Sequence, residues 1–124
     1  MLISVIIYTH NRSDDLKDVL YSFSGQTTND DFDYEIIIVD NNSKDKTKEM
    51  VQSYKTTFNG KLKYLFEPRQ GKPYALNKAI EEAKGEIIAF TDDDCIIDKG
   101  WLLNIAKSFN GNNSGIKMVG GKCL

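Results

Sequence analysis

The chain has 124 residues, of which 40% are hydrophobic and 27% are charged, and its formal net charge at pH 7 is −2. This length is typical of one domain and is enough to fold around a hydrophobic core without a disulfide or a metal ion, so we expect one domain over residues 1–124. The composition excludes a disordered chain, a collagen-like repeat and a coiled coil. The slightly negative charge argues against binding to nucleic acid, which requires a basic face.

The N-terminal part of the chain is expected to form a strand, a helix and a second strand. Residues 4–8 are a continuous β-branched and aromatic run, as in a strand that is covered on both faces. Apolar side chains then recur at helical spacing over residues 16–23, with Ser13 or Asp14 as the expected cap. Residues 34–39 form a second apolar run that predicts another buried strand.

Further helices and strands alternate along the rest of the chain. Ser43 or Asp45 is expected to cap a second helix, and residues 62–66 alternate like a strand. Pro73 stands where a third helix tolerates it, in the first turn. The remaining elements are a strand at residues 86–90, a helix at 101–109 and a strand at 116–119. This alternation predicts an α/β fold, with a mostly parallel sheet and helices on both of its faces.

Polar and charged residues follow the expected strands. In parallel sheets of this kind, ligands bind at the carboxyl ends of the strands, near the point where the strand order reverses. We therefore expect a binding site built from several separate loops. The loops are residues 9–12, 40–43, 69–72 and 92–94.

The acidic triplet Asp92-Asp93-Asp94 is the most specific of these features. Three carboxylates beside a buried strand repel one another, and a divalent cation such as Mg²⁺ or Mn²⁺ removes that conflict. The triplet offers too few oxygens for a closed site, so the ion would complete its shell with water and substrate phosphates. The alternative is a solvated acidic turn before a helix, where acids are favoured.

Three other polar residues have both a functional and a structural interpretation. Asp40 either accepts hydrogen bonds from a base or ribose, or opens a turn. Lys72 either meets the charge of a phosphate or is merely solvated. One histidine without a nearby nucleophile is weak grounds for acid–base catalysis, so we interpret His10 as a structural or backbone-contact residue.

Two features bear on cellular location. Residues 1–7 are apolar but have no basic residue ahead of them, which indicates a buried strand rather than a signal peptide. Cys95 and Cys123 are too few for a disulfide framework and lack the spacing of metal ligands, so two reduced thiols are expected. Together these features predict a cytoplasmic protein.

Four segments together resemble the motifs of the family 2 glycosyltransferases with the GT-A fold. They are SVIIYTHNR at 4–12, IVDNNS at 38–43, GKPYALNKA at 71–79 and IAFTDDD at 88–94. The resemblance covers nearly the whole chain and implies a Rossmann-like three-layer sandwich. It also implies a nucleotide-sugar donor, usually a UDP-sugar, a divalent cation, and transfer of the sugar to an acceptor hydroxyl with inversion.

The resemblance further implies roles for individual residues. Asp40 would hydrogen-bond the base, and Asp92 or Asp93 would lie near the ribose or the donor sugar. Asp92 and Asp94 would be the metal ligands, with Asp94 favoured. The residues implied in donor binding are Thr9, Asn11, Arg12, Asp40, Asn42, Lys72, Asn77, Asp92 and Asp93.

Two departures from the family pattern matter. Many relatives have arginine before the asparagine of the third motif, whereas Leu76 precedes Asn77 here. Either Lys72 supplies that charge, or the donor contacts differ. The acidic base of the family lies beyond the position of Gly120-Gly121, and the sequence ends at Leu124, so no catalytic base is predicted. We therefore expect a donor-binding half, from a shortened chain or a short natural frame, with feeble or absent transfer by itself.

Two other functional classes remain as alternatives. A phospho-acceptor receiver module needs an acidic pair after the first strand, where this chain has Thr9-His10. A non-catalytic assembly module would self-associate, as a homodimer, through an exposed sheet edge at residues 116–119. The acceptor, a saccharide or a lipid, and any peripheral association of the full-length protein with a membrane are not specified by the sequence.

Overall fold

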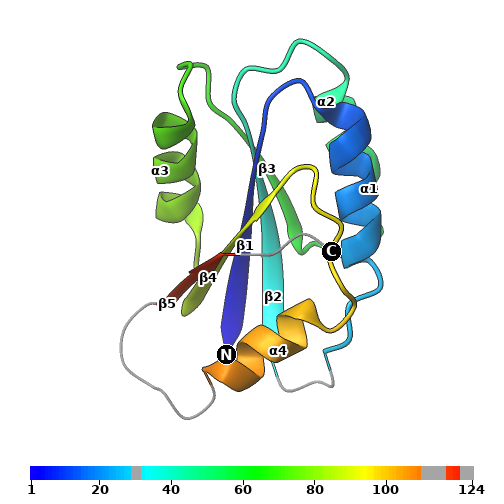
Figure 1. Cartoon of the computed structure of the whole chain (residues 1–124). Coiled ribbons are helices and arrows are strands. Elements are labelled where there is room, and N and C mark those ends of the chain that lie inside the picture. Colours follow the sequence, from blue (N-terminus) through cyan, green and yellow to red (C-terminus); the bar gives the residue numbers. More distant parts are fainter. Residues whose placement is uncertain (29–31, 110–116, 121–124) are drawn as a thin grey trace.

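The computed structural model describes residues 1–28, 32–109 and 117–120, the last as backbone only. Its five strands form one sheet in the order β3-β2-β1-β4-β5, and every strand pair is parallel (Figure 1). The predicted α/β fold with a parallel sheet is therefore confirmed. The strands are β1 Leu2–Thr9, β2 Asp33–Asp40, β3 Leu62–Phe66, β4 Ile87–Asp92 and β5 Lys117–Gly120. The helices are α1 Ser13–Phe23, α2 Thr47–Ser53, α3 Lys72–Glu82 and α4 Trp101–Ser108.

The strand order reverses at β1, which pairs with β2 on one side and with β4 on the other. The register places Thr9 beside Asp40, and Tyr8 beside Asp92. The loops that leave these three strands therefore meet at one edge of the sheet. In open α/β sheets this reversal point is where ligands bind.

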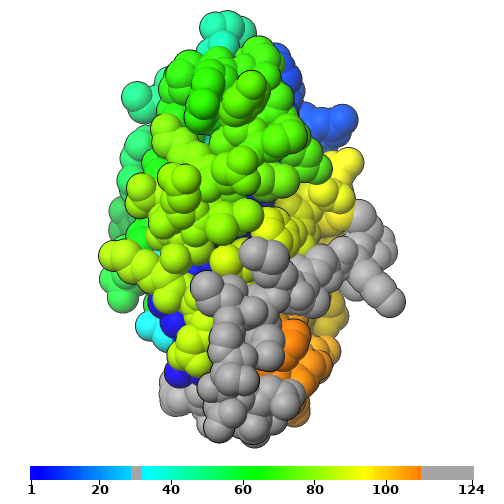
Figure 2. Space-filling view, turned by 90° about the vertical axis from the view of Figure 1, so that its left-hand side faces the viewer, coloured from blue at the N-terminus to red at the C-terminus, as the bar shows by residue number. Residues whose placement is uncertain are grey.

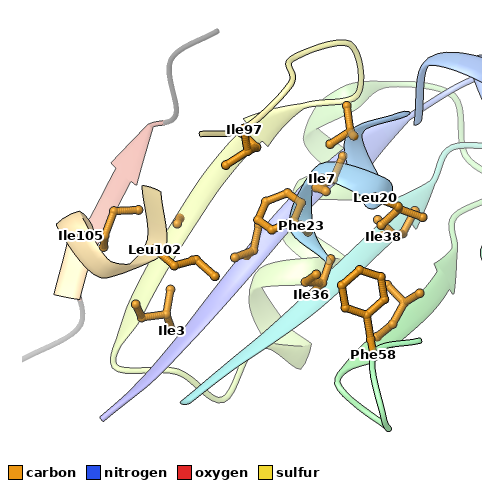
Figure 3. Packing of buried hydrophobic residues seen from close by; sticks show 14 of the residues in the cluster. Ile3, Ile7, Leu20, Phe23, Ile36, Ile38, Phe58, Ile97, Leu102 and Ile105 are labelled. Carbon is orange, nitrogen blue, oxygen red and sulfur yellow. The ribbon is translucent and has the colours of Figure 1, made fainter. Parts of the chain in front are cut away.

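Helices cover both faces of the sheet, as the sequence predicts. On one face, Ile3 and Ile7 of β1 pack with buried side chains of α1, α2 and α4 (Figure 3). On the other, Ile6 packs with Ala75 and Ala79 of α3, which covers much of the face seen in Figure 2. Successive side chains of a strand point to opposite faces, so one apolar run supplies both layers of the core.

The predicted cap of α1, Ser13 or Asp14, is wrong, whereas Asp45, one of the two residues predicted to cap α2, does bind the first turn of that helix. The residues before the first turns of α1 and α2 are Arg12 and Lys46, and neither makes a capping hydrogen bond through its side chain. Instead, Asp45 serves both helices. Its Oδ2 accepts a hydrogen bond from the N–H of Ser13 at 3.1 Å, and its Oδ1 accepts one from the N–H of Thr47 at 3.0 Å. Burial opposes the charge of Asp45, but the hydrogen bonds from Thr47 and Ser13 outweigh burial and lower its pKa.

A buried polar network ties the strands together away from their carboxyl ends. The hydroxyl of Ser4 donates to Oε2 of Glu35 at 2.5 Å and accepts from the N–H of Gly85 at 2.8 Å. Glu35 also accepts from the N–H of Lys84 at 2.9 Å, and its Oε1 lies 2.8 Å from Nζ of Lys63. The network joins β1, β2, β3 and the connection between α3 and β4.

No helix in residues 1–28 or 32–109 is both long and apolar enough to cross a bilayer.

Candidate functional site at the carboxyl edge of the sheet

The loops after β1 and β2 are bound directly to each other. The N–H of Asn11 donates to the hydroxyl of Ser43 at 2.8 Å, and Oδ1 of Asn11 accepts from the N–H of Lys44 at 2.6 Å. Asn11 and Asn42 both have positive φ, 54° and 63°, a conformation that asparagine tolerates better than most residues. The structure therefore brings together these two predicted loops. It also confirms His10 as a backbone contact, with Nδ1 2.6 Å from the carbonyl oxygen of Asn41.

Asp40 is buried at the end of β2, with both carboxylate oxygens bound. Oδ1 accepts from the N–H of Ser43 at 2.9 Å, and Oδ2 accepts from the hydroxyl of Tyr64 on β3 at 2.5 Å. Burial, together with the charge of Asp40, raises the pKa of the Tyr64 phenol well above its usual value. Asp40, Tyr64 and Phe66 help to line a hollow of about 280 Å³. Tyr64 was not predicted as a site residue, because an aromatic residue on a strand gives no signal in the sequence beyond β-propensity.

Arg12 connects the loop after β1 with the acidic triplet. Its Nε lies 4.0 Å from Oδ1 of Asp93, and its Nη1 lies 3.7 Å from Oδ2 of Asp94 and 3.4 Å from Oδ2 of Asp15. Burial raises the pKa of Asp93, the Thr9 hydroxyl and Arg12 act to lower it, and Asp94 adds to the increase. The net effect is a raised pKa for Asp93.

Asp92 and Asp94 form the part of the triplet that suits a cation. Their carboxylate oxygens and the sulfur of Cys95 lie within 4.8 Å of one another. Both acids are exposed, whereas Asp93 is only 8% exposed. Two exposed oxygen donors that leave room for water and phosphate oxygens fit the preferences of Mg²⁺ or Mn²⁺.

Cys95 corrects an expectation from the sequence. Its sulfur lies 3.8 Å from an oxygen of Asp92 and 3.8 Å from an oxygen of Asp94, but it belongs to a disulfide rather than to a reduced thiol. The number and spacing of cysteines did not predict this, because they carry no information on which sulfurs the fold brings together. The expectation for Cys123 falls outside the described residues. A disulfide sulfur is not a thiolate, so of these three residues only the two carboxylates offer ligand atoms of the kind that a divalent cation prefers.

Two buried hydroxyls lie on the strands that carry this site. Thr9 at the end of β1 and Thr91 in β4 are 0% and 8% exposed. Within the described part of the chain, neither hydroxyl oxygen has a hydrogen-bond partner. The Thr9 hydroxyl faces Asp93 closely enough to influence its pKa, without reaching hydrogen-bond geometry.

The third motif divides between two places. Nζ of Lys72 lies 5.4 Å from the ring centroid of Tyr8, next to the end of β1. Asn77, in contrast, lines a separate hollow of about 470 Å³ with Glu67 and Arg69. No contact that the structure gives for Asn77 joins it to the acidic triplet. Hydrogen bonds from Arg69 lower the pKa of Glu67 to about 2.

The largest described hollow lies away from the triplet. It has a volume of about 730 Å³, is lined by residues of α1, of α2 and of the loops before them, and includes none of the three acids. The volume of a pocket therefore does not identify the candidate site. The site is identified by the loops that converge where the strand order reverses.

Comparisons with known proteins find relatives over nearly the whole chain. Residues 4–121 match the family model "Glycosyl transferase family 2". AglE of Haloferax volcanii is 33% identical over 119 residues, covering 96% of this chain and 38% of AglE. The GalNAc(5)-diNAcBac-PP-undecaprenol beta-1,3-glucosyltransferase of Campylobacter jejuni is 34% identical over 125 residues. The match covers 98% of this chain and 38% of that enzyme. The chain thus spans less than two fifths of the length of these relatives.

Solved structures show the same fold. TarS of Staphylococcus aureus in complex with UDP-GlcNAc is 31% identical with a TM-score of 0.74, covering 89% of this chain and 31% of that one. The mannosyltransferase PcManGT of Pyrobaculum calidifontis, in complex with GDP-Man and Mn²⁺, is 30% identical with a TM-score of 0.77, covering 87% and 32%. Matched through nearly its whole length in sequence and in fold, the chain belongs to glycosyl transferase family 2 and has the GT-A fold.

Proposed function

We propose that residues 1–124 form the donor-binding part of an inverting glycosyltransferase that takes its sugar from a UDP-sugar. The observation that carries this proposal is the meeting of Arg12 with the acidic triplet, where the strand order reverses. The relative crystallised with UDP-GlcNAc supports a uridine donor. The relative crystallised with GDP-Man makes guanosine the competing base.

Asp92 and Asp94 would hold the divalent cation, Mn²⁺ or Mg²⁺, through their carboxylate oxygens. When bound, such a cation stabilises the negative charge that grows on a departing diphosphate. Arg12, which lies within 4.0 Å of both Asp93 and Asp94, would hold these acids in place and balance their charge. The relative crystallised with Mn²⁺ supports the choice of ion.

The nucleoside would lie against the loops after β1 and β2. Asp40 would accept a hydrogen bond from the base, since each oxygen already bound by Ser43 or Tyr64 keeps a second lone pair. Thr9, Asn11 and Asn42 would line the same pocket. Lys72 would meet the diphosphate. Asn77 lines a different pocket, so its predicted role in donor binding requires that part of the donor occupies that pocket. That role stays a prediction.

Titration calorimetry with UDP tests the proposal. We expect binding at or below millimolar UDP with Mn²⁺, and affinity at least about tenfold weaker without Mn²⁺ or in Asp94→Ala, because a charge-assisted interaction is lost. Asp18→Ala, which removes an exposed acid of α1, is the matched control and should bind as the parent does. Absence of binding at millimolar UDP would refute the donor site. Equal binding by Asp94→Ala would refute the metal assignment.

An assembly role is the second candidate, and one observation favours it. β5 lies at the edge of the described sheet, next to β4. Exposed edge strands pair readily with other chains, so β5 could form a homodimer. Such a dimer would be compatible with donor binding and would not replace it. Light scattering gives the molar mass of the protein in solution. A value of twice the monomer mass would support the dimer, and a value equal to the monomer mass would exclude it. The receiver-like alternative has no support, since β1 ends at Thr9, is followed by His10 rather than by an acidic pair, and the chain belongs to family 2.

The acceptor is the least constrained partner. The name of the Campylobacter jejuni relative includes an undecaprenol-linked saccharide, which supports a lipid-linked or saccharide acceptor for the complete protein. An acceptor of that kind would bring the full-length protein to a membrane surface as a peripheral protein.

A further inference from the structure

Asn41, the residue after β2, is wholly buried and uses every hydrogen-bonding group of its side chain. Its Nδ2 donates to the carbonyl oxygens of Glu67 at 3.0 Å and Arg69 at 2.6 Å. Its Oδ1 accepts from the N–H of Gly71 at 3.0 Å and from the hydroxyl of Tyr8 at 3.2 Å. A primary amide has two N–H groups and two lone pairs on its oxygen, so this side chain is completely satisfied.

The backbone of Asn41 adds three further contacts. Its N–H donates to the carbonyl oxygen of Thr9 at 2.9 Å. Its carbonyl oxygen accepts from Nε2 of Gln70 at 3.3 Å and lies 2.6 Å from Nδ1 of His10. Because a carbonyl can only accept, Nδ1 of His10 carries the proton, and Nε2 is then free to accept from Nδ2 of Asn11 at 3.2 Å. One residue therefore joins the end of β1 to the loop that precedes α3.

That loop leads directly into Lys72. Gly71 has φ 137°, where a side chain would be strained, and a Cβ there would lie 3.1 Å from the ring of Tyr74. The next residue, Lys72, begins α3 and holds its Nζ 5.4 Å from the ring centroid of Tyr8. Tyr8 in turn donates to Asn41. The contacts thus form a closed circuit from Asn41 through Gly71 and Lys72 to Tyr8.

We propose that Asn41 is a positioning residue that fixes the loop of residues 67–71 and thereby places the Lys72 ammonium at the diphosphate end of the donor site. The part of this inference that concerns the diphosphate rests on the proposed function. The part that concerns the loop does not, because it follows from the contacts of the chain alone. An amide is required: a carboxylate at position 41 would set an oxygen against the carbonyls of Glu67 and Arg69, where the amide donates.

Asn41→Asp is the test variant, since it keeps the shape of the side chain and replaces the two N–H donors with a carboxylate oxygen. Glu35→Gln is the matched control, because it perturbs another buried hydrogen-bonded group, on a different part of the sheet. A loss of stability that both variants share is then the effect of perturbing a buried polar group, and not a specific effect on the loop of residues 67–71. If Asn41→Asp does not fold, as judged by circular dichroism, Tyr8→Phe takes its place; it removes one hydrogen bond to Asn41 and leaves the ring beneath Lys72.

The first measurement needs no ligand. Trypsin cleaves after arginine and lysine but not before proline, so within residues 67–73 only the bond after Arg69 is a substrate. We expect cleavage there to be at least about fivefold faster in Asn41→Asp than in the parent, because the opened loop is more populated, and unchanged in Glu35→Gln. Equal cleavage in Asn41→Asp and Glu35→Gln would overturn the inference.

The second measurement separates phosphate from nucleoside. We expect the affinity for UDP with Mn²⁺ to fall about tenfold in Asn41→Asp, and the affinity for uridine, measured by ligand-observed NMR, to change less than about twofold. Lys72→Ala should reduce the affinity for UDP less in the Asn41→Asp background than in the parent, since both substitutions remove the same interaction between Lys72 and the diphosphate. Equal losses for UDP and uridine, or additive losses in the double variant, would overturn the inference. If the parent fails to bind UDP, the proposed function fails, and the cleavage result still decides the role of Asn41 in the loop.

Discussion

At the scale of single residues, Glu35 shows how the chain keeps a charge inside the fold. Only 6% of the residue is exposed, and burial alone would raise the pKa of its carboxyl group. Hydrogen bonds from Lys63, Ser4 and the N–H of Lys84 outweigh burial and lower the pKa below its ordinary value of 4.5. A carboxylate whose pKa is lowered on folding stabilises the folded state as long as it remains ionised.

Glu35→Gln should therefore change the pH dependence of stability. The contribution of the ionised group is fully present above pH 4.5, the ordinary value, and is lost as the pH falls through the lower folded-state pKa. We expect the parent to exceed Glu35→Gln in free energy of unfolding at pH 7, and the difference between the two proteins to shrink as the pH falls below 4.5. Urea unfolding of both proteins at several pH values measures it. A difference that is constant across the series would contradict the account of the Glu35 charge.

The acidic triplet illustrates what single residues reveal in the sequence. The residue types and their place after a buried strand predicted a cation site, and the structure gathers Asp92 and Asp94 as that prediction requires. The sequence did not specify the different environment of Asp93, which is buried beside Arg12. Arg12 and Asp93 are far apart along the chain, and only the parallel pairing of β1 with β4 brings them together.

At the scale of elements, the connection from α3 to β4 depends on a close approach at Gly85. A Cβ at this position would lie 2.6 Å from the backbone nitrogen and 2.7 Å from the hydroxyl of Ser4, and 2.8 Å from the carbonyl oxygen of Leu2. Two of these three atoms are backbone of β1 and cannot move without disturbing the central strand. Glycine is therefore required at position 85 because a side chain would clash with β1, and not because of the backbone conformation.

Gly85→Ala should destabilise the protein by about 1 to 3 kcal/mol, the usual effect of forcing an added methyl group into a packed region. Gly25→Ala is the matched control, because a Cβ at Gly25 meets nothing within 4 Å. Chemical denaturation of the two variants and the parent gives the comparison. Equal stability of Gly85→Ala and Gly25→Ala would show that β1 yields more easily than the contacts suggest.

Helix ends were the elements that the sequence predicted least well. The apolar spacing of residues 16–23 correctly predicted α1, because that pattern is local to the helix. The cap was wrong because Asp45, which binds the first turn of α1, comes from the loop before another helix. Local rules consider only neighbours in the chain, and therefore cannot identify a cap that the fold brings from elsewhere.

At the scale of the whole molecule, a donor that lies across β1, β2 and β4 can bind only the folded sheet. Ligands that bind only the folded state stabilise it by about 2.7 kcal/mol at a concentration of 100 times Kd. UDP with Mn²⁺ at that concentration should therefore raise the melting temperature by several degrees, as measured by scanning calorimetry. Asp94→Ala at the same concentrations should show a smaller rise. An unchanged melting temperature in the parent would contradict donor binding across these strands.

The central position of β1 also has a consequence for synthesis of the chain. Ile3 of β1 pairs with Tyr34 of β2 on one side, and on its other side it pairs with Ile87 of β4, which comes much later in the chain. A nascent chain that has emerged only as far as α3 therefore exposes one edge of its innermost strand, which is a surface prone to pairing with other chains. The same late strand brings Asp93 and Asp94 to Arg12. During synthesis, one event, the arrival of β4, both closes the exposed edge of β1 and completes the proposed donor site.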